Sequence, residues 1–400
     1  MPTLKNRVKR LAKGYLPEIT QMRRHFHMFP ELSGKEIQTA AFISKQLSEW
    51  GIAHKTGIAG NGILAVITGE LPGKKVVALR ADMDALPVKE LNKVAYASRT
   101  KGVMHACGHD AHMASMMGTA RLLKSLEAEF GGTVKIIFQP SEEKYPGGAL
   151  PMIKAGVLEK PMTDLIIGQH VFPELEAGKV GFRSGQYMAS TDEIHLTVKG
   201  KGGHAAIPDK VIDPVLIAAH IIVALQQIVS RNAKPTMPTV LSFGKVMADG
   251  VANIIPDEVK ISGTMRTFDE GWRVEMKERI TDMATALAKS MGGTCEVDIH
   301  KGYPFVYNDP ALTTRAKKLA EEYLGRDKVV DLEMRMTAED FAYFAQEVPG
   351  CFYRLGVMNE SKGITSNLHS ATFDVDESSL ETGVGLMTWI VMNELGQNRE

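Results

Sequence analysis

The feature that most constrains the fold of this 400-residue chain is an alternation of strand-like and helix-like segments that is interrupted once. Short runs rich in β-branched residues predict strands at 62–69, 75–80, 134–138 and 165–168. Helical patterns lie around them, at 35–50, 111–129 and 148–158. Strands that alternate with helices predict a mostly parallel sheet whose faces are covered by helices.

From about residue 187 the predicted order changes to β-α-β-β-α-β, which is typical of a ferredoxin-like sandwich. The expected strands span 194–198, 239–246, 259–265 and 294–299, and the expected helices span 214–229 and 272–291. After residue 300 the α/β pattern resumes, with helices at 310–324, 338–346 and 378–395 and a strand at 351–357. We therefore predict one α/β domain formed by residues 1–186 and 301–400, interrupted by an inserted domain of residues 187–300.

Composition excludes several classes of protein. Lys plus Arg and Asp plus Glu both number 47, so the formal net charge is 0 and there is no basic footprint for nucleic acid. The most apolar long segment, 211–229, is interrupted by an acidic residue, a histidine and two glutamines, so we expect no membrane span. Three widely spaced cysteines, Cys107, Cys295 and Cys351, argue against a disulfide scaffold and for the cytoplasm. We expect Cys295 and Cys351 to be core residues.

The densest group of chemically active residues is the segment 105–112, which holds three histidines, Cys107 and one aspartate. A lone histidine on an apolar face is usually a satisfied core residue, but this composition is costly to bury without a purpose. Imidazole and thiolate are the ligands that borderline metals select, so metal binding is favoured. If the segment is extended, positions 107 and 109 direct both donors to one point.

Two adjacent carboxylates, Glu142 and Glu143, follow the apolar run 133–138. Taken alone, such a pair is typical of a solvated loop, although it also suits a shared cation. His170 follows the predicted strand 165–168, and His369 lies in a loop near the C-terminus; each alone is weak evidence. If these strand and loop ends converge, five donors are available for two ions that share a ligand: Cys107, His109, Glu143, His170 and His369.

Asp82 and Asp84 follow the predicted strand 75–80 and have two interpretations. They could cap a turn before a loop. Alternatively, their carboxylates could hold a ligand histidine by its second ring nitrogen.

These motifs resemble those of peptidase family M20, and most closely its subfamily D of hippurate hydrolases, indole-acetyl-amino-acid hydrolases and N-acetyl-diaminopimelate deacetylases. The matching segments run almost from end to end of the chain: 23–32, 80–87, 105–110, 139–143, 203–205, 253–256, 263–266, 338–341 and 368–369. The resemblance implies a mixed-sheet α/β/α catalytic domain of the zinc-exopeptidase type, interrupted by a ferredoxin-like lid and dimerisation domain.

The resemblance also implies roles for individual residues. Two divalent ions (Zn, Mn, Co or Ni) would be held by the five donors named above, with Glu142 as the general acid/base. His204, in the inserted domain, would polarise the scissile carbonyl, either within one chain or across a homodimer. Asn253 and Arg266 would hold the carboxylate of the substrate.

Three departures bear on specificity. Arg80-Ala-Asp82 stands where most peptidases of the wider family have His-x-Asp, Cys107 stands where they have a bridging Asp, and Phe29 replaces a common histidine. The first two changes fit subfamily D and argue against a peptidase specificity. We expect a cytoplasmic amidohydrolase acting on small N-acyl amino acids. The alternatives are a metallo-dipeptidase or carboxypeptidase, and a non-enzymatic binding protein, against which the intact Glu142–Glu143 pair argues.

Overall fold

The computed structural model describes residues 3–396 and divides the chain into two compact units, each with its own hydrophobic core. Unit 1 comprises the described residues up to Gly185, Tyr307–Glu333 and the residues from Asp340 onward. Unit 2 comprises Gln186–Val306 and Met334–Glu339. The short segment 334–339 joins unit 2 because the backbone of Arg335 pairs with that of Tyr187 and Ala189.

Unit 1 is built on an eight-stranded mixed sheet. Its strands, in spatial order, are β1 (Ala53–Ile58), β2 (Gly62–Thr68), β4 (Gly131–Gln139), β3 (Leu71–Asp82), β5 (Leu165–Glu176), β16 (Gly350–Met358), β6 (Val180–Phe182) and β15 (Val329–Asp331). The central strands β4, β3, β5 and β16 run parallel, and β1, β2 and β6 add antiparallel pairs. The predicted α/β sheet is therefore confirmed, although β1, β6 and β15 were not predicted.

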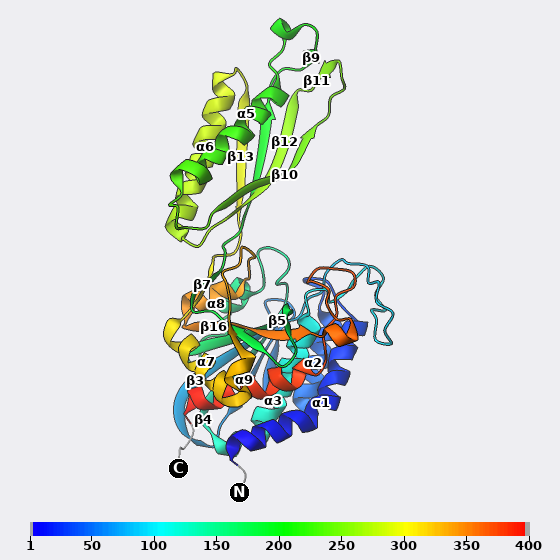
Figure 1. Cartoon of the computed structure of the whole chain (residues 1–400), viewed down its shortest axis with the longest axis vertical. Helices are drawn as coiled ribbons and strands as arrows, with labels where there is room; N and C mark the ends of the chain where they lie inside the picture. Colours follow the sequence, from blue (N-terminus) through cyan, green and yellow to red (C-terminus); the bar gives the residue numbers. More distant parts are fainter. Residues whose placement is uncertain (1–2, 397–400) are drawn as a thin grey trace. The chain divides into compact units, whose positions relative to one another are not determined.

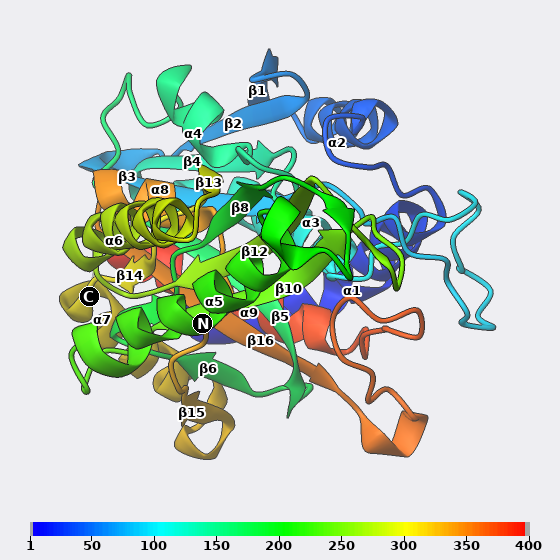
Figure 2. The same cartoon turned by 90° about the horizontal axis from the view of Figure 1, so that it is seen from above.

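Helices cover both faces of this sheet (Figures 1 and 2). On one face α1 (Leu4–Met28), α3 (His109–Ser125) and α9 (Ser379–Leu395) pack against one another, and α7 (Pro310–Leu324) packs on α9. On the other face α4 (Ala149–Lys154) contacts α8 (Phe341–Glu347). The helix α2 (Ile37–Glu49) packs on β1 and β2 on the same face as α1, with Ile43 and Leu47 in the core that α1, α3 and α9 share. Successive residues of β5 face the helices on opposite sides of the sheet. Gly168 lies against Phe341 of α8, and Gln169 accepts a hydrogen bond from Ser115 of α3.

The elements of unit 2 follow the predicted β-α-β-β-α-β order, which confirms the expected ferredoxin-like fold. Its elements are β8 (Asp192–Lys199), α5 (Pro214–Gln227), β10 (Val240–Ala248), β12 (Glu258–Arg266), α6 (Glu270–Ser290) and β13 (Thr294–Lys301). The sheet order is β10-β12-β8-β13, with every pair antiparallel, and α5 and α6 contact each other on one face. A two-stranded ribbon, β9 (Gly203–His204) with β11 (Ile254–Ile255), lies at one end of the unit (Figure 1).

Shorter elements complete the chain. Strands β7 (Gly185–Met188) and β14 (Val306–Asn308) lie where the chain passes between the units. Single helical turns span Glu127–Glu129, Pro208–Lys210, Ile228–Asn232, Arg326–Lys328 and Glu360–Lys362.

The segment 214–232 is long and apolar enough to cross a membrane by length and composition alone. In unit 2 its helix α5 buries Ile217, Ile221 and Leu225 in the core that it forms with β8 and β12. The helix thus covers one face of the sheet. Cys351 and Cys295 are core residues, as predicted, with 0% and 9% of their surface exposed.

Candidate metal centre

Five segments of unit 1 bring polar side chains to one end of the sheet. Because β3, β4 and β5 run parallel, their carboxyl ends and the loops that follow them share one edge. The contributing segments are the end of β3, the start of α3, the loop after β4, the middle of β5 and the loop before α9. They carry, in that order, Asp82 and Asp84; Cys107, His109 and His112; Glu142 and Glu143; His170; and His369.

The possible ligand atoms form overlapping sets, in each of which all atoms lie within 4.8 Å of one another. One set is Cys107, His109 and His170, and a second is Cys107, Glu143 and His369. Cys107 Sγ lies 3.5 Å from His170 Nε2, and His369 Nε2 lies 3.2 Å from Glu143 Oε1. The structure therefore brings together all five residues expected to hold metal, with the thiol of Cys107 common to both sets.

The local structure around two of these donors differs from the prediction. His170 does not follow its strand, because β5 continues to Glu176 alongside β16. The segment 107–109 is not extended either, since α3 begins at His109 and Gly108 caps it in the left-handed region, with φ of 85°. A Cβ added at Gly108 would lie 2.5 Å from Val171 Cγ2, so only glycine fits this turn without displacing β5.

Backbone carbonyl groups fix which ring nitrogen two histidines present to the cluster. His109 Nδ1 donates to the carbonyl oxygen of Asp84 at 2.8 Å, and His170 Nδ1 donates to that of Val171 at 2.8 Å. Each ring therefore presents Nε2 as the free lone pair when neutral. Within residues 3–396, His109 Nε2 is buried and has no hydrogen-bond partner. A buried nitrogen of this kind is costly unless something binds it, so the cluster fits a cation.

Asp84 organises the loop that carries the two glutamates. Its carboxylate accepts the backbone N–H groups of Glu142 and Glu143, both at 3.0 Å, and the hydroxyl of Ser33 at 2.6 Å. The residue thus holds His109 through its carbonyl group and the glutamate loop through its side chain. We expected the Asp84 carboxylate to bond a ligand histidine. It is the backbone carbonyl of Asp84 that accepts from His109 Nδ1, at 2.8 Å, while the carboxylate Oδ1 lies 3.5 Å from the same nitrogen.

Asp82 contacts His112, a histidine for which no role was predicted. His112 Nδ1 donates to Asp82 Oδ1 at 2.6 Å, and His112 Nε2 accepts the N–H of Val171 at 2.9 Å. Both ring nitrogens are thereby occupied, so His112 is a positioning residue for the neighbouring His170, whose ring centre is 4.3 Å away. The spacing in the sequence could have indicated this role, because a residue three positions after His109 lies on the same face of a helix. Arg80 Nη1 donates to Asp82 Oδ2 at 2.7 Å and fixes its carboxylate.

The electrostatics of the cluster favour a bound cation. Burial alone would lower the pKa of His109, but the carboxylates of Asp82, Asp84 and Glu143 outweigh it and raise that pKa to about 10. Burial, followed by Glu143 and Glu142, raises the pKa of the Cys107 thiol well above its usual value. The site therefore holds an excess of negative charge that protons neutralise when no cation is bound, and a metal ion would displace those protons.

Backbone strain marks two positions beside the cluster. Ser141, which precedes Glu142, has φ of 57°, and His369 has φ of 62°. Left-handed conformations of this kind cost non-glycine residues about 1–3 kcal/mol each and persist where surrounding contacts impose them. The N–H of Ser141 donates to Glu36 Oε1 at 2.9 Å, and that of His369 donates to the carbonyl of Ala106 at 2.8 Å. These bonds hold both loops in place.

The other three predicted site residues lie in unit 2. His204 pairs with Ile254 in the β9–β11 ribbon, and the carbonyl of Asn253 accepts the N–H of Ala205 at 3.0 Å. Arg266 is the last residue of β12, at the opposite end of the sheet from the ribbon. Because β12 has nine residues, its ends are roughly 26 Å apart. Asn253 and Arg266 of one chain therefore cannot reach the same small carboxylate while the unit keeps this fold.

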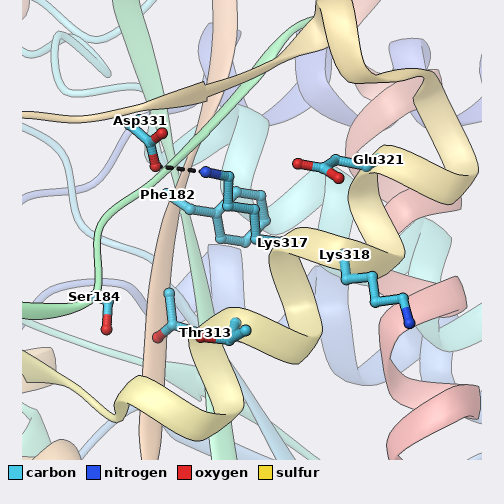
Figure 3. Close-up of a pocket in the computed structure, with 8 residues that line it drawn as sticks. Phe182, Ser184, Thr313, Lys317, Lys318, Glu321 and Asp331 are labelled. Atoms are coloured by element: carbon cyan, nitrogen blue, oxygen red, sulfur yellow. Dashed lines mark hydrogen bonds and ion pairs between the residues drawn. The ribbon is translucent and has the colours of Figure 1, made fainter.

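A separate surface hollow of about 340 Å³ lies between α7 and the β6–β15 edge of unit 1 (Figure 3). Its lining includes Phe182, Ser184 and Thr313, and Lys317 Nζ pairs with Asp331 Oδ1 across it at 2.6 Å. None of its lining residues belongs to the cluster of histidines, cysteine and carboxylates.

A comparison of the sequence with known protein families agrees with this grouping of residues. The sequence model of peptidase family M20/M25/M40 matches residues 78–393, a range that contains every residue of the cluster. The chain belongs to this family.

Relatives in the family carry out different hydrolytic reactions. The chain is 38% identical to the N-acetyl-L-cysteine deacetylase of Bacillus subtilis (strain 168), over 91% of this chain and 85% of that protein. It is 39% identical to thermostable carboxypeptidase 2 of Saccharolobus solfataricus, over 95% of each chain. Among solved structures, the YXEP protein of Bacillus subtilis, described as a dinuclear metal-binding peptidase of the M20 family, is 34% identical with a TM-score of 0.83, over 96% of this chain and 99% of that one. This M20 chain is therefore a hydrolase of the amidohydrolase and peptidase type.

Proposed function

We propose that this M20 hydrolase uses two divalent metal ions (Zn, Mn, Co or Ni) to cleave the amide bond of N-acyl amino acids. The products are a carboxylic acid and a free amino acid. The observation that carries the proposal is the pair of ligand sets that share Cys107, with Glu142 beside them. Two ions with a common ligand need this arrangement of donors.

The donor types fit such a centre. Thiolate, imidazole and carboxylate together suit Zn, Mn, Co or Ni. Metals of this kind lower the pKa of bound water toward neutrality and polarise carbonyl oxygens. Cys107, His109 and His170 would hold one ion, and Cys107, Glu143 and His369 the other.

The two glutamates have different surroundings and different proposed roles. Glu143 Oε1 lies 3.2 Å from His369 Nε2 and 4.0 Å from His109 Nε2, between the two histidines, as a ligand should. Glu142 is buried and forms a set with His109 and Glu143. We assign Glu142 as the general base that takes the proton of the attacking water and then passes it to the leaving amine.

Unit 2 supports a homodimer in which two chains complete each site. His204 and Asn253 lie at the ribbon end of the unit and Arg266 at the other end, roughly 26 Å along β12. If all three contact one substrate, His204 and Asn253 must come from one chain and Arg266 from the other. His204 would then polarise the scissile carbonyl, while Asn253 and Arg266 hold the substrate carboxylate.

Unit 2 has an exposed apolar surface that such a dimer would bury. Val215, Leu216 and Val223 of α5 are 43%, 51% and 73% exposed, and Val246 and Met247 of the edge strand β10 are 53% and 52% exposed. A helix face beside an unpaired edge strand is a surface that a second copy can cover by symmetric pairing. We propose a homodimer formed through unit 2.

A cytoplasmic location is also proposed. All three cysteines are unpaired and buried, and Cys107 needs its thiol to serve as a ligand. Thiols in this state are typical of a reducing compartment.

The competing function is a metallo-carboxypeptidase or dipeptidase, favoured by the similarity to the Saccharolobus carboxypeptidase. The deciding experiment compares N-acetyl and N-benzoyl amino acids with unblocked dipeptides, before and after chelator treatment and metal restoration. We expect the blocked amino acids to be cleaved with a higher kcat/KM, with loss on chelation and recovery with metal. Preferred cleavage of unblocked dipeptides would support the competing function.

A further inference from the structure

A second group of side chains that could hold a metal ion lies in unit 2, on the face of the sheet opposite the core that α5 and α6 cover. On β8, Ile194 and Leu196 point into the core, so Glu193 and His195 alternate onto the opposite face. On β13, Val297 and Ile299 pack against the same core. Asp298 and His300 therefore share the outer face with the two residues of β8.

The strand register places these four residues next to one another. His195 is directly opposite Asp298, and Glu193 is directly opposite His300. The two histidines are diagonal neighbours with ring centres 4.9 Å apart. One possible ligand atom from each of Glu193, His195 and His300 lies within 4.8 Å of the other two.

The neighbours of the two rings prepare them to act as ligands. Asp298 Oδ2 lies 2.8 Å from His300 Nε2, so this nitrogen faces the carboxylate. Nδ1 is then the ring nitrogen of His300 that could face an ion. Ser262 Oγ lies 3.2 Å from His195 Nδ1, and Glu193 Oε2 lies 3.5 Å from His195 Nε2. A carboxylate bonded to the second nitrogen of a ligand histidine fixes its tautomer and increases its basicity.

Glu193 and His195 lie on β8, which is hydrogen-bonded on both sides, to β12 and to β13, and His300 lies on β13 in the paired register. Few degrees of freedom therefore need to be fixed for the three donors to meet, because only side-chain rotations remain. The side chains of Glu193, His195 and His300 are 70%, 39% and 52% exposed, which leaves a dissolved ion free access.

We propose that Glu193, His195 and His300 form a second divalent metal site in unit 2, separate from the cluster of unit 1, with Asp298 as the positioning residue for His300. Two imidazoles and one carboxylate are a donor set that zinc adopts with water as a fourth ligand. A bound ion would join β8 to β13, the edge strand of the sheet. The proposal does not depend on the activity assigned to unit 1.

The test is a calorimetric titration with Zn²⁺ of the full chain whose unit 1 centre has first been saturated with metal. The wild-type protein should bind one further equivalent per chain, and the double variant His195→Asn/His300→Asn should lose that binding. Asp298→Asn should weaken it by roughly 10–100-fold, the usual effect of removing a carboxylate behind a ligand histidine. His220→Asn, which changes an exposed histidine of α5, is the matched control and should bind like the wild type.

A Zn²⁺ soak with anomalous diffraction gives a second measurement that does not depend on the variants. A peak bounded by His195 and His300 is expected. Equal Zn²⁺ binding by the wild type, the double variant and the control, or no peak at this position, would overturn the proposal. Because turnover should be the same in the wild type and the double variant, failure of this inference is distinguishable from failure of the proposed hydrolysis.

Discussion

At the scale of single residues, the cluster depends on groups that hold the ligands as much as on the ligands themselves. Asp84 is the clearest case, because its carbonyl orients His109 while its carboxylate accepts the N–H groups of Glu142 and Glu143. One residue thus couples a proposed metal ligand to the proposed general base. Its replacement should affect both functions.

Asp84→Asn tests this coupling. The new amide N–H₂ would face a backbone N–H donor, so one of the two loop bonds is lost and the glutamate loop loosens. We expect metal affinity and turnover each to fall roughly 10–100-fold, as for other groups that hold metal ligands. Asp164→Asn is the control, since Asp164 also accepts a backbone N–H, that of Val76, and belongs to neither of the two ligand sets described above. Equal metal affinity and turnover in Asp84→Asn and the wild type would argue against the assigned role.

The pH dependence of metal binding follows from the pKa of His109, which burial would lower but Asp82, Asp84 and Glu143 raise to about 10. Below that pH the metal-free imidazole carries a proton that an incoming ion must displace. Apparent affinity should therefore rise with pH, roughly tenfold per unit for each proton released, and fall as the solution becomes acidic. Competition with a chromophoric chelator at pH 6, 7 and 8 measures this slope. An affinity independent of pH would show that the histidine is already neutral.

At the scale of elements, the start of α3 determines whether Cys107 and His109 meet. Gly108 adopts φ of 85° and lies against Val171 of β5, so two constraints act at one position. The sequence shows the glycine but not the neighbour, because Val171 is 63 residues away along the chain.

Gly108→Ala separates these constraints when it is compared with Gly102→Ala. Gly102 has φ of 76°, but a Cβ there would meet nothing within 4 Å, so only the left-handed strain of about 1–2 kcal/mol applies. Gly108→Ala should add a further 1–3 kcal/mol or so from overpacking. Calorimetric unfolding should rank the wild type, Gly102→Ala and Gly108→Ala in falling stability, with reduced metal affinity only in Gly108→Ala. Equal losses in the two variants would contradict this account.

The sequence predicted most of the helices and strands and the donors of the cluster, because motifs of polar residues after apolar runs are local signals. It missed β1, whose strand is mostly exposed, and the three-residue strands β6 and β15. It gave His112 no role and placed His170 after its strand. Those details depend on Asp82 and on the pairing of β5 with β16, which are contacts between distant parts of the chain.

At the scale of the whole molecule, the central question is how many chains build one active site. The two ends of β12 separate Arg266 from His204 and Asn253 by roughly 26 Å. A single substrate contacted by all of them requires two copies of the chain. If the proposed contacts of all three residues are made, dimer formation is a condition for activity.

Coexpression of His204→Ala with Arg266→Ala tests this requirement. Each variant alone should be nearly inactive, but a mixed dimer contains one site with both residues intact. Random pairing should restore about one quarter of wild-type activity, since half of the dimers are mixed and each has one working site. Absence of recovery, in a preparation shown to contain mixed dimers, would mean that both residues act within one chain or that neither contacts the substrate.

The two adjacent glutamates are proposed to have different roles in catalysis: Glu143 holds metal and Glu142 moves the proton. The most direct measurement is metal content and turnover on the same preparations of the wild type, Glu142→Gln and Glu143→Gln. Glu142→Gln should keep the wild-type metal content while turnover falls by at least roughly 10²–10⁴-fold, the usual contribution of a general base. Glu143→Gln should lose metal. Near-normal turnover by a metal-replete Glu142→Gln variant would contradict the central claim.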